Sequence, residues 1–161
     1  MARCLLPWFL VAGTYGAVIG YYKLTDDVLV WNGPPPQLFF EFRMPAGTVL
    51  PDKPDAVRVD LDTEKNQMFA TLTGTSADSG RPVIQGVVEL YFRTSSRMLV
   101  LRIEGEPDRL FELDLPADPP NSPDFGPWRH VDYIDDRPGE TPRKAGETDA
   151  YEVRYRVERA D

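Results

Sequence analysis

Apolar and polar residues alternate with a period of two over much of this chain. The clearest stretches are residues 38–43, 57–62, 83–92, 98–103, 110–115 and 151–157. Successive side chains of a strand point to opposite faces of a sheet, so this alternation predicts half-buried antiparallel strands. A Glu-Gly-Glu-Pro-Asp sequence at 104–108 separates two of these stretches, which predicts a hairpin.

Glycine and proline fill the gaps between the predicted strands, including residues 74–82, and no amphipathic helical pattern follows residue 23. Roughly seven or eight short strands over about 120 residues are typical of two packed antiparallel sheets. The sequence therefore predicts an all-β fold, a single antiparallel β-sandwich over residues 38–161 that is immunoglobulin-like in the broad sense of a double sheet. The alternative is a small β-barrel that includes the N-terminal segment.

Residues 117–149 depart from the strand pattern. They are rich in proline, aspartate and glycine, which predicts a flexible loop before the last strand. Within this loop, residues 125–128 (Phe-Gly-Pro-Trp) form an apolar island. Because exposed aromatic side chains would be left in water, we expect the island to dock on the sandwich as an irregular strand.

No charged residue occurs between Arg3 and Lys23. A helix of the nineteen residues 4–22 would be roughly 28 Å long, close to the thickness of the hydrocarbon core of a bilayer. The sequence therefore predicts that residues 1–23 form a transmembrane helix or signal anchor, which contacts membrane lipid through residues 4–22. A weak bias of positive charge places the N-terminus in the cytoplasm and the rest outside. The proline-rich residues 24–37 follow as a connector.

Two other interpretations of the N-terminal segment stay open. A cleaved signal peptide also begins with a short basic region, although this apolar run is long and no clean cleavage site follows it. A soluble protein could instead use the segment as a buried pair of strands that turns at Gly13 or Gly16.

Three glycines would share one face of the predicted helix. Gly13, Gly16 and Gly20 are spaced at i, i+3 and i+7, and the last two complete a GxxxG pattern. Small residues on one face allow another helix to approach closely. These glycines are therefore the helix-packing candidates, and they indicate a membrane protein as a partner.

Composition narrows the classes of function. The chain has 161 residues, which is the size of one domain with a short additional segment. Its 26 acidic residues outnumber its 18 lysines and arginines, and the net charge of −8 disfavours nucleic-acid binding. A single Cys and a single His exclude an internal disulfide, cysteine-based metal sites and mechanisms that need two imidazoles. We therefore predict no cofactor.

Two stretches contain residue types that carry chemistry in other proteins. Residues 60–66 carry oxygen ligands at alternate positions, as a calcium loop does, but Lys65 stands where glycine is required and Thr71 where glutamate is required. No metal site is predicted. His130 lies close to Asp132 in the sequence, but no nucleophile elbow accompanies them, so we predict no catalytic residue and no enzyme. A hydrolase that uses His130 is kept as a third hypothesis.

Charged residues alternate along the last predicted strand. Arg154 and Arg156 face one side of it, between Glu152 and Glu158. Mixed charge is typical of a solvated strand or an edge strand, and an edge strand can accept a strand from a partner. The interface candidates are Trp128, His130, Arg154 and Arg156.

The missing catalytic sets and the predicted anchor favour one function. We predict a membrane-anchored, non-enzymatic accessory or binding module, single-pass in the cell membrane, whose extracytoplasmic β-domain contacts another protein. In a Gram-negative bacterium this domain would be periplasmic. The alternative is a soluble β-barrel that binds a small ligand in a cavity lined by aromatic residues. These are Trp8, Phe9, Tyr15, Phe39, Phe40, Phe92 and Phe111.

Overall fold

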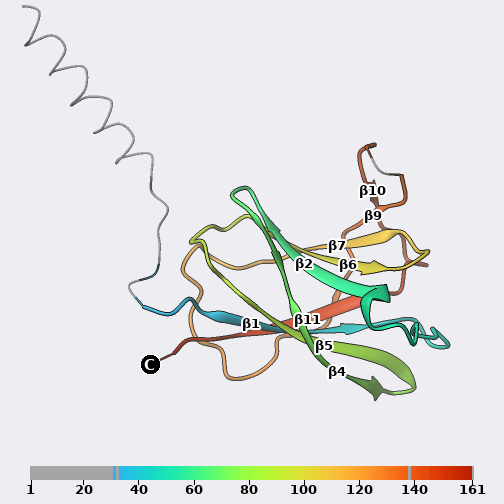
Figure 1. The fold of residues 1–161 in the computed structure, drawn as a ribbon, viewed down its shortest axis with the longest axis horizontal. Helices are drawn as coiled ribbons and strands as arrows, with labels where there is room; N and C mark the ends of the chain where they lie inside the picture. The colour runs from blue at the N-terminus through green and yellow to red at the C-terminus, as the bar shows by residue number, and fades with distance from the viewer. Residues whose placement is uncertain (1–30, 32, 138, 161) are drawn as a thin grey trace, which may run out of the picture.

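The strands of this chain form two antiparallel sheets that pack against each other (Figure 1). The computed structural model describes residue 31, residues 33–137 and residues 139–160. Sheet A has the strand order β4-β5-β1-β11-β8, and sheet B has the order β10-β9-β7-β6-β2-β3. The strands are β1 (Gln37–Arg43), β2 (Val57–Thr63), β3 (Gln67–Phe69), β4 (Thr71–Asp78), β5 (Arg81–Glu89), β6 (Arg97–Ile103), β7 (Asp108–Glu112), β8 (Arg129–His130), β9 (Tyr133–Asp135), β10 (Arg143–Lys144) and β11 (Glu152–Glu158). A turn of 3-10 helix, Pro54–Ala56, precedes β2, and the described residues contain no α-helix.

The predictions for the N-terminal segment lie outside the described residues. They comprise the membrane helix over 1–23, its lipid contacts over 4–22 and the helix-packing candidates Gly13, Gly16 and Gly20. In the part of the chain that the structure describes, no helix is long and apolar enough to cross a membrane.

The core lies between the two sheets and is built from the apolar positions of the period-two pattern. Phe40 and Phe42 of β1 are at most 1% exposed, and their ring centroids are 5.3 Å apart. Phe111 of β7 meets Phe42 from sheet B at 4.9 Å. The all-β prediction is therefore confirmed for the described residues, and their arrangement is that of a β-sandwich. The barrel alternative is wrong for these strands, because they form two open sheets.

Gly86 on β5 permits close packing against the neighbouring strands. A Cβ atom at this position would lie 2.4 Å from Cζ and 2.8 Å from Cε2 of Phe40 on β1. It would also lie 3.0 Å from the main-chain oxygen of Thr71 on β4. The ring of Phe40 thus occupies the space that any larger residue at position 86 would need.

The structure confirms the predicted hairpin turn at 104–108 but not the predicted loop at 74–82. β6 and β7 pair as predicted, around a turn in which Gly105 has a φ of 82°. The pattern predicts a loop over residues 74–82, but this prediction is wrong, because only Ser79 and Gly80 form the turn between β4 and β5. Both residues have positive φ, 54° and 78°, as a type I′ turn requires. The sequence predicts a loop here because the small polar residues of β4 do not show an alternation of apolar and polar positions.

The last strand, β11, is interior rather than the edge that its charges indicate. It pairs with β1 along its whole length and with β8 on its other side. Beyond β8, the amides of Ser122 and Gly126 donate to the carbonyls of Val157 (2.8 Å) and Tyr155 (3.0 Å). The edge-strand prediction is therefore wrong, because a preceding segment covers β11.

Residues 117–149 contain short strands where the sequence predicts one long loop. β8, β9 and β10 all lie in this stretch, and β9 joins sheet B beside β7. The apolar island at 125–128 lies along β11, through the hydrogen bond of Gly126. Asp149 accepts hydrogen bonds from Arg143 (3.0 Å) and from the amide of Gly146 (2.8 Å). The hydrogen bond from Arg143 lowers the pKa of Asp149 to about 2, so this turn is held by an ionised carboxylate.

Candidate functional site

Three of the four predicted interface residues come together on the outer face of sheet A. There, three arginines alternate with three aromatic rings in an arginine–aromatic ladder, in the order Arg43, Trp128, Arg154, Phe125, Arg156 and Phe39. The successive distances between guanidinium carbons and ring centroids are 4.2, 4.5, 5.1, 5.4 and 4.4 Å. These distances are those of cation–π contacts.

Every arginine of the ladder is also paired with a carboxylate. Arg154 donates to Glu41 at 2.6 Å, and Gln85 donates to the other oxygen of the same carboxylate at 2.8 Å. The remaining pairs are Arg43 with Asp78 and Glu152, and Arg156 with Glu158. Because its charges are neutralised internally, the ladder acts mainly to fix residues 122–128 on sheet A.

Replacing Arg154 with glutamine is expected to destabilise the protein by about 2 kcal/mol. The substitution leaves Glu41, which is only 7% exposed, without its charged partner, and it removes the cation from between two rings. Urea unfolding of the full chain, followed by circular dichroism, measures the change. The matched control is Arg137→Gln, because Arg137 is exposed and its ion pairs lie at the surface. Equal effects of the two substitutions would contradict a stabilising role for the ladder.

His130 lies apart from the ladder. Its side chain is exposed on β8, opposite Glu152 of β11. Its Nδ1 atom lies 3.0 Å from the carbonyl oxygen of the next residue, Val131. The structure therefore gives His130 a local main-chain partner and does not join it to the other three interface candidates.

The acidic stretch that resembles a calcium loop is used for ion pairing. Asp60 is fully buried, pairs with Arg102 and accepts a hydrogen bond from Gln67 at 3.3 Å. Burial raises the pKa of the neighbouring Asp62. Among residues 31, 33–137 and 139–160, no group of three His, Cys, Asp or Glu lies close enough to hold a metal ion.

Of the seven aromatic residues predicted to line one ligand cavity, the four that the structure describes are spread over different parts of the sandwich. Phe40 and Phe111 are buried in the core, whereas Phe39 stands on the outer face of sheet A in the ladder. Phe92 packs edge-on against Tyr91, with ring centroids 5.1 Å apart. The other three members, Trp8, Phe9 and Tyr15, lie outside the described residues.

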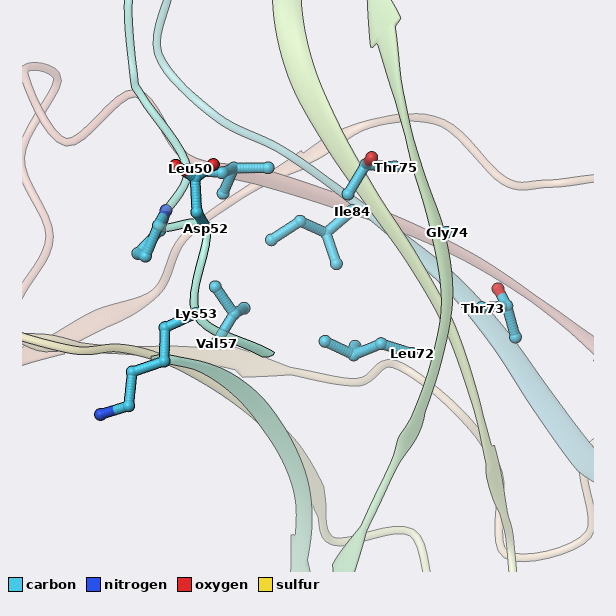
Figure 2. Close-up of a pocket in the computed structure, with 10 residues that line it drawn as sticks. Leu50, Asp52, Lys53, Val57, Leu72, Thr73, Gly74, Thr75 and Ile84 are labelled. Atoms are coloured by element: carbon cyan, nitrogen blue, oxygen red, sulfur yellow. The ribbon is translucent and has the colours of Figure 1, made fainter. Parts of the chain in front are cut away.

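A different cavity, of about 490 Å³, opens between the two sheets beside β4 (Figure 2). Four aliphatic side chains from four segments line it: Leu50, Val57, Leu72 and Ile84. Figure 2 shows these side chains pointing toward one another, while Lys53 and Thr73 point away from the cavity. The middle of the cavity is therefore apolar, and its polar groups lie at the rim.

The outer side of β4 is an open strand edge in the described part of the chain, since β4 pairs only with β5. The carbonyl of Pro82 on β5 accepts a hydrogen bond from Met44 at 2.9 Å, on the side of β1. The main-chain groups of Pro82 therefore do not face its partner on β4, Ala77. In an antiparallel pair of this kind, the N–H and C=O of Ala77 point away from β5. The N–H and C=O of Thr75, two residues earlier on β4, also point away from β5.

The core side of this edge is uncovered. Thr75 pairs with Ile84, which is buried, so the side chains of both point inward. Thr75 is nevertheless exposed, and so is Ala77. A bulge between Leu72 and Gly74 sets this register, because the extra residue lets Leu72 and Thr75 point to the same side. The open edge and the apolar cavity thus adjoin each other.

The sequence interpretation missed this site for a physical reason. Residues 71–77 carry no charge and only one large apolar side chain, Leu72, so no alternation is visible. Two signals were available: β-branched threonines at alternate positions from 71 to 75, and the Asp-Ser-Gly sequence before Arg81.

Comparisons of this chain with protein-family models, with curated proteins and with solved structures found no match.

Proposed function

We propose that this protein is a non-enzymatic binding module, held in the cell membrane by residues 4–22, whose β-sandwich contacts another protein outside the cytoplasm. In a Gram-negative bacterium this compartment is the periplasm. The observation that carries the proposal is the open edge of β4 beside a cavity lined by aliphatic side chains. The charged lining residues are Asp52 and Lys53, and Lys53 pairs with Glu104 at 3.3 Å. Such a lining supports apolar contact rather than acid–base chemistry.

The place where the chain enters the sandwich supports this arrangement. Trp31 donates from its indole nitrogen to the carbonyl of Leu90 at 2.6 Å, just after the end of β5. Its ring lies 5.3 Å from the guanidinium of Arg93 and 5.1 Å from that of Arg159. Both arginines donate to Asp118. This cluster fixes Trp31 to one end of the sandwich.

The open edge lies toward the other end of sheet A. Thr75 and Ala77 are paired near the start of β5, whereas Trp31 contacts the residue after its end. The eight Cα-to-Cα steps from Lys23 to Trp31 reach at most about 28 Å. With residues 4–22 in the bilayer, the chain would enter the sandwich at the end of β5 opposite the edge and the cavity, so its point of entry leaves them accessible to a partner.

Photo-crosslinking of the full-length chain in its native membranes tests the proposal. Benzoylphenylalanine is placed at Val49, which is 88% exposed and precedes Leu50 of the cavity, or at Thr73. We expect both positions to give a crosslinked species of one discrete mass. The control position is Glu147, which is exposed on the turn after β10 and should give none. No adduct from Val49 or Thr73, or an equal yield from Glu147, would count against the proposal.

A small apolar ligand is the second candidate for the cavity. Its volume of about 490 Å³ lies within the range of small-molecule sites, and its lining is aliphatic. This candidate keeps the small-ligand function of the soluble carrier that the sequence allows, but not its barrel or its aromatic lining. Recovery of the full chain in the soluble fraction without detergent would favour it over the membrane-held module.

A further inference from the structure

We propose that the open edge of β4 receives an extended segment of the partner protein as an added antiparallel strand, with one apolar side chain of that segment in the adjoining cavity. This inference rests on the proposed function and specifies how the partner is recognised. The partner's contribution is thus a short, uncharged β-strand rather than a helix or a charged loop.

The other strand edges of the described residues are less suited to this role. β3 has three residues, and β8 and β10 have two each. β10 consists of Arg143 and Lys144, whose charges discourage pairing. β4 has eight residues, and its first seven carry neither charge nor proline. Residues 71–77 of β4 are therefore the longest stretch of strand edge without charge or proline among the described residues.

The main chain of β4 supplies the recognition chemistry. The N–H and C=O groups of Thr75 and Ala77 point to the open side, as the hydrogen bond to Pro82 requires. An added antiparallel strand places one residue opposite each of them and exchanges two hydrogen bonds with each. Strand addition of this kind obtains affinity from main-chain bonds and specificity from pockets for alternate side chains.

The cavity selects the side chains of the added strand. Residues directly opposite each other in a sheet have side chains on the same face. The side chain of Thr75 points inward, so the residue opposite it also points inward, toward Leu50, Val57 and Leu72. An aliphatic side chain is the chemistry that this lining accepts.

The bulge limits the length of the added strand. Regular pairing of β4 is interrupted between Leu72 and Gly74. The edge beyond it ends at Asp78, whose carboxylate is paired with Arg43 at 2.6 Å. The partner segment therefore pairs over the second half of β4, around Thr75 and Ala77.

A synthetic peptide tests this geometry. It alternates valine and threonine, ends in a lysine on each side and carries a fluorescent label. Its binding to the full chain in mild detergent is measured by fluorescence anisotropy. When the valines point inward, their own amides face β4. We therefore expect N-methylation of the valine nitrogens to weaken binding about tenfold. N-methylation of the threonine nitrogens, which face solvent, is the matched control and should leave binding unchanged.

Substitution of Ala77 tests the same edge from the protein side. Ala77→Pro removes an N–H that does not bond to β5, so the fold is expected to persist, as prolines are tolerated at the open edge of a sheet. We expect binding to weaken about tenfold, whereas Ala77→Ser, which keeps the N–H, should bind as the parent chain does. Circular dichroism checks that the variants are folded.

Three results would overturn the inference. The first is equal binding of the two methylated peptides, and the second is no binding of the parent peptide at about 1 mM. The third is self-association of the chain that Ala77→Pro abolishes, because the occupant of the edge would then be a second copy. If photo-crosslinks from Val49 persist in the Ala77→Pro chain, the sandwich still binds a protein. In that case strand addition fails while the proposed function stands.

Discussion

Replacing Phe42 with alanine is expected to destabilise the sandwich by about 4 kcal/mol. Its ring is fully buried at the centre of the core, 5.3 Å from Phe40 of the same strand and 4.9 Å from Phe111 of the opposite sheet. Removing it loses the burial of a large apolar side chain and leaves a cavity between two sheets that strand pairing holds in place. Urea unfolding of the full chain, followed by circular dichroism, measures this loss.

The control for this prediction is Phe69→Ala. Phe69 is 68% exposed on the short strand β3, so its removal should change the free energy of unfolding by less than about 0.5 kcal/mol. A domain of this size is typically stable by about 5–15 kcal/mol, so the loss of Phe42 removes much of the total. A Phe42→Ala protein as stable as the Phe69→Ala control would show that this aromatic contact does not hold the sheets together.

Replacing Gly86 with alanine is expected to cost about 3 kcal/mol by overpacking. The new methyl group would lie 2.4 Å from Cζ of Phe40 and 3.0 Å from the main-chain oxygen of Thr71. Neither neighbour can move easily, because Phe40 is a core residue and Thr71 belongs to the paired strand β4. The melting temperature and the urea midpoint of the full chain should both fall.

Gly74→Ala is the matched control, in the strand next to Gly86. A Cβ atom there would lie 3.6 Å from Oε1 of Gln85, which is an ordinary contact. We expect this variant to be nearly as stable as the parent chain. A second variant, Phe40→Leu combined with Gly86→Ala, should recover part of the loss, because the smaller side chain vacates space. Equal losses of stability in Gly74→Ala and Gly86→Ala would contradict overpacking against Phe40 as the cause of the loss at position 86.

The strands with visible alternation could be predicted from the sequence, and the reason is burial on one face. Leu38, Phe40 and Phe42 have to be apolar because they face sheet B, while Glu41 and Arg43 do not. β4 could not be recognised in this way. Thr75 and Ala77 face an uncovered part of the core side, so the positions that would show the period do not need large apolar side chains.

The sequence predicts three members of the arginine–aromatic ladder, Trp128, Arg154 and Arg156, but not how they are arranged. The charges of β11 resemble those of an edge, because Arg154 and Arg156 alternate with glutamates. Their partners, Glu41 and the rings of Phe125 and Trp128, are distant in the sequence, and only the folded sheet brings them close. The order of strands in a sheet is set by such long-range contacts, which local patterns do not encode.

The pairing of β1 with β11 also governs how the chain can acquire its structure. Glu152 and Arg43 are 109 positions apart, yet they sit in adjacent strands of one sheet. Until residues 152–158 have been synthesised, one side of β1 has no strand beside it. The unpaired main-chain groups on that side of β1 can then pair with another chain, which favours aggregation. Such high contact order slows folding, and sheet A can be completed only after β11 has been synthesised.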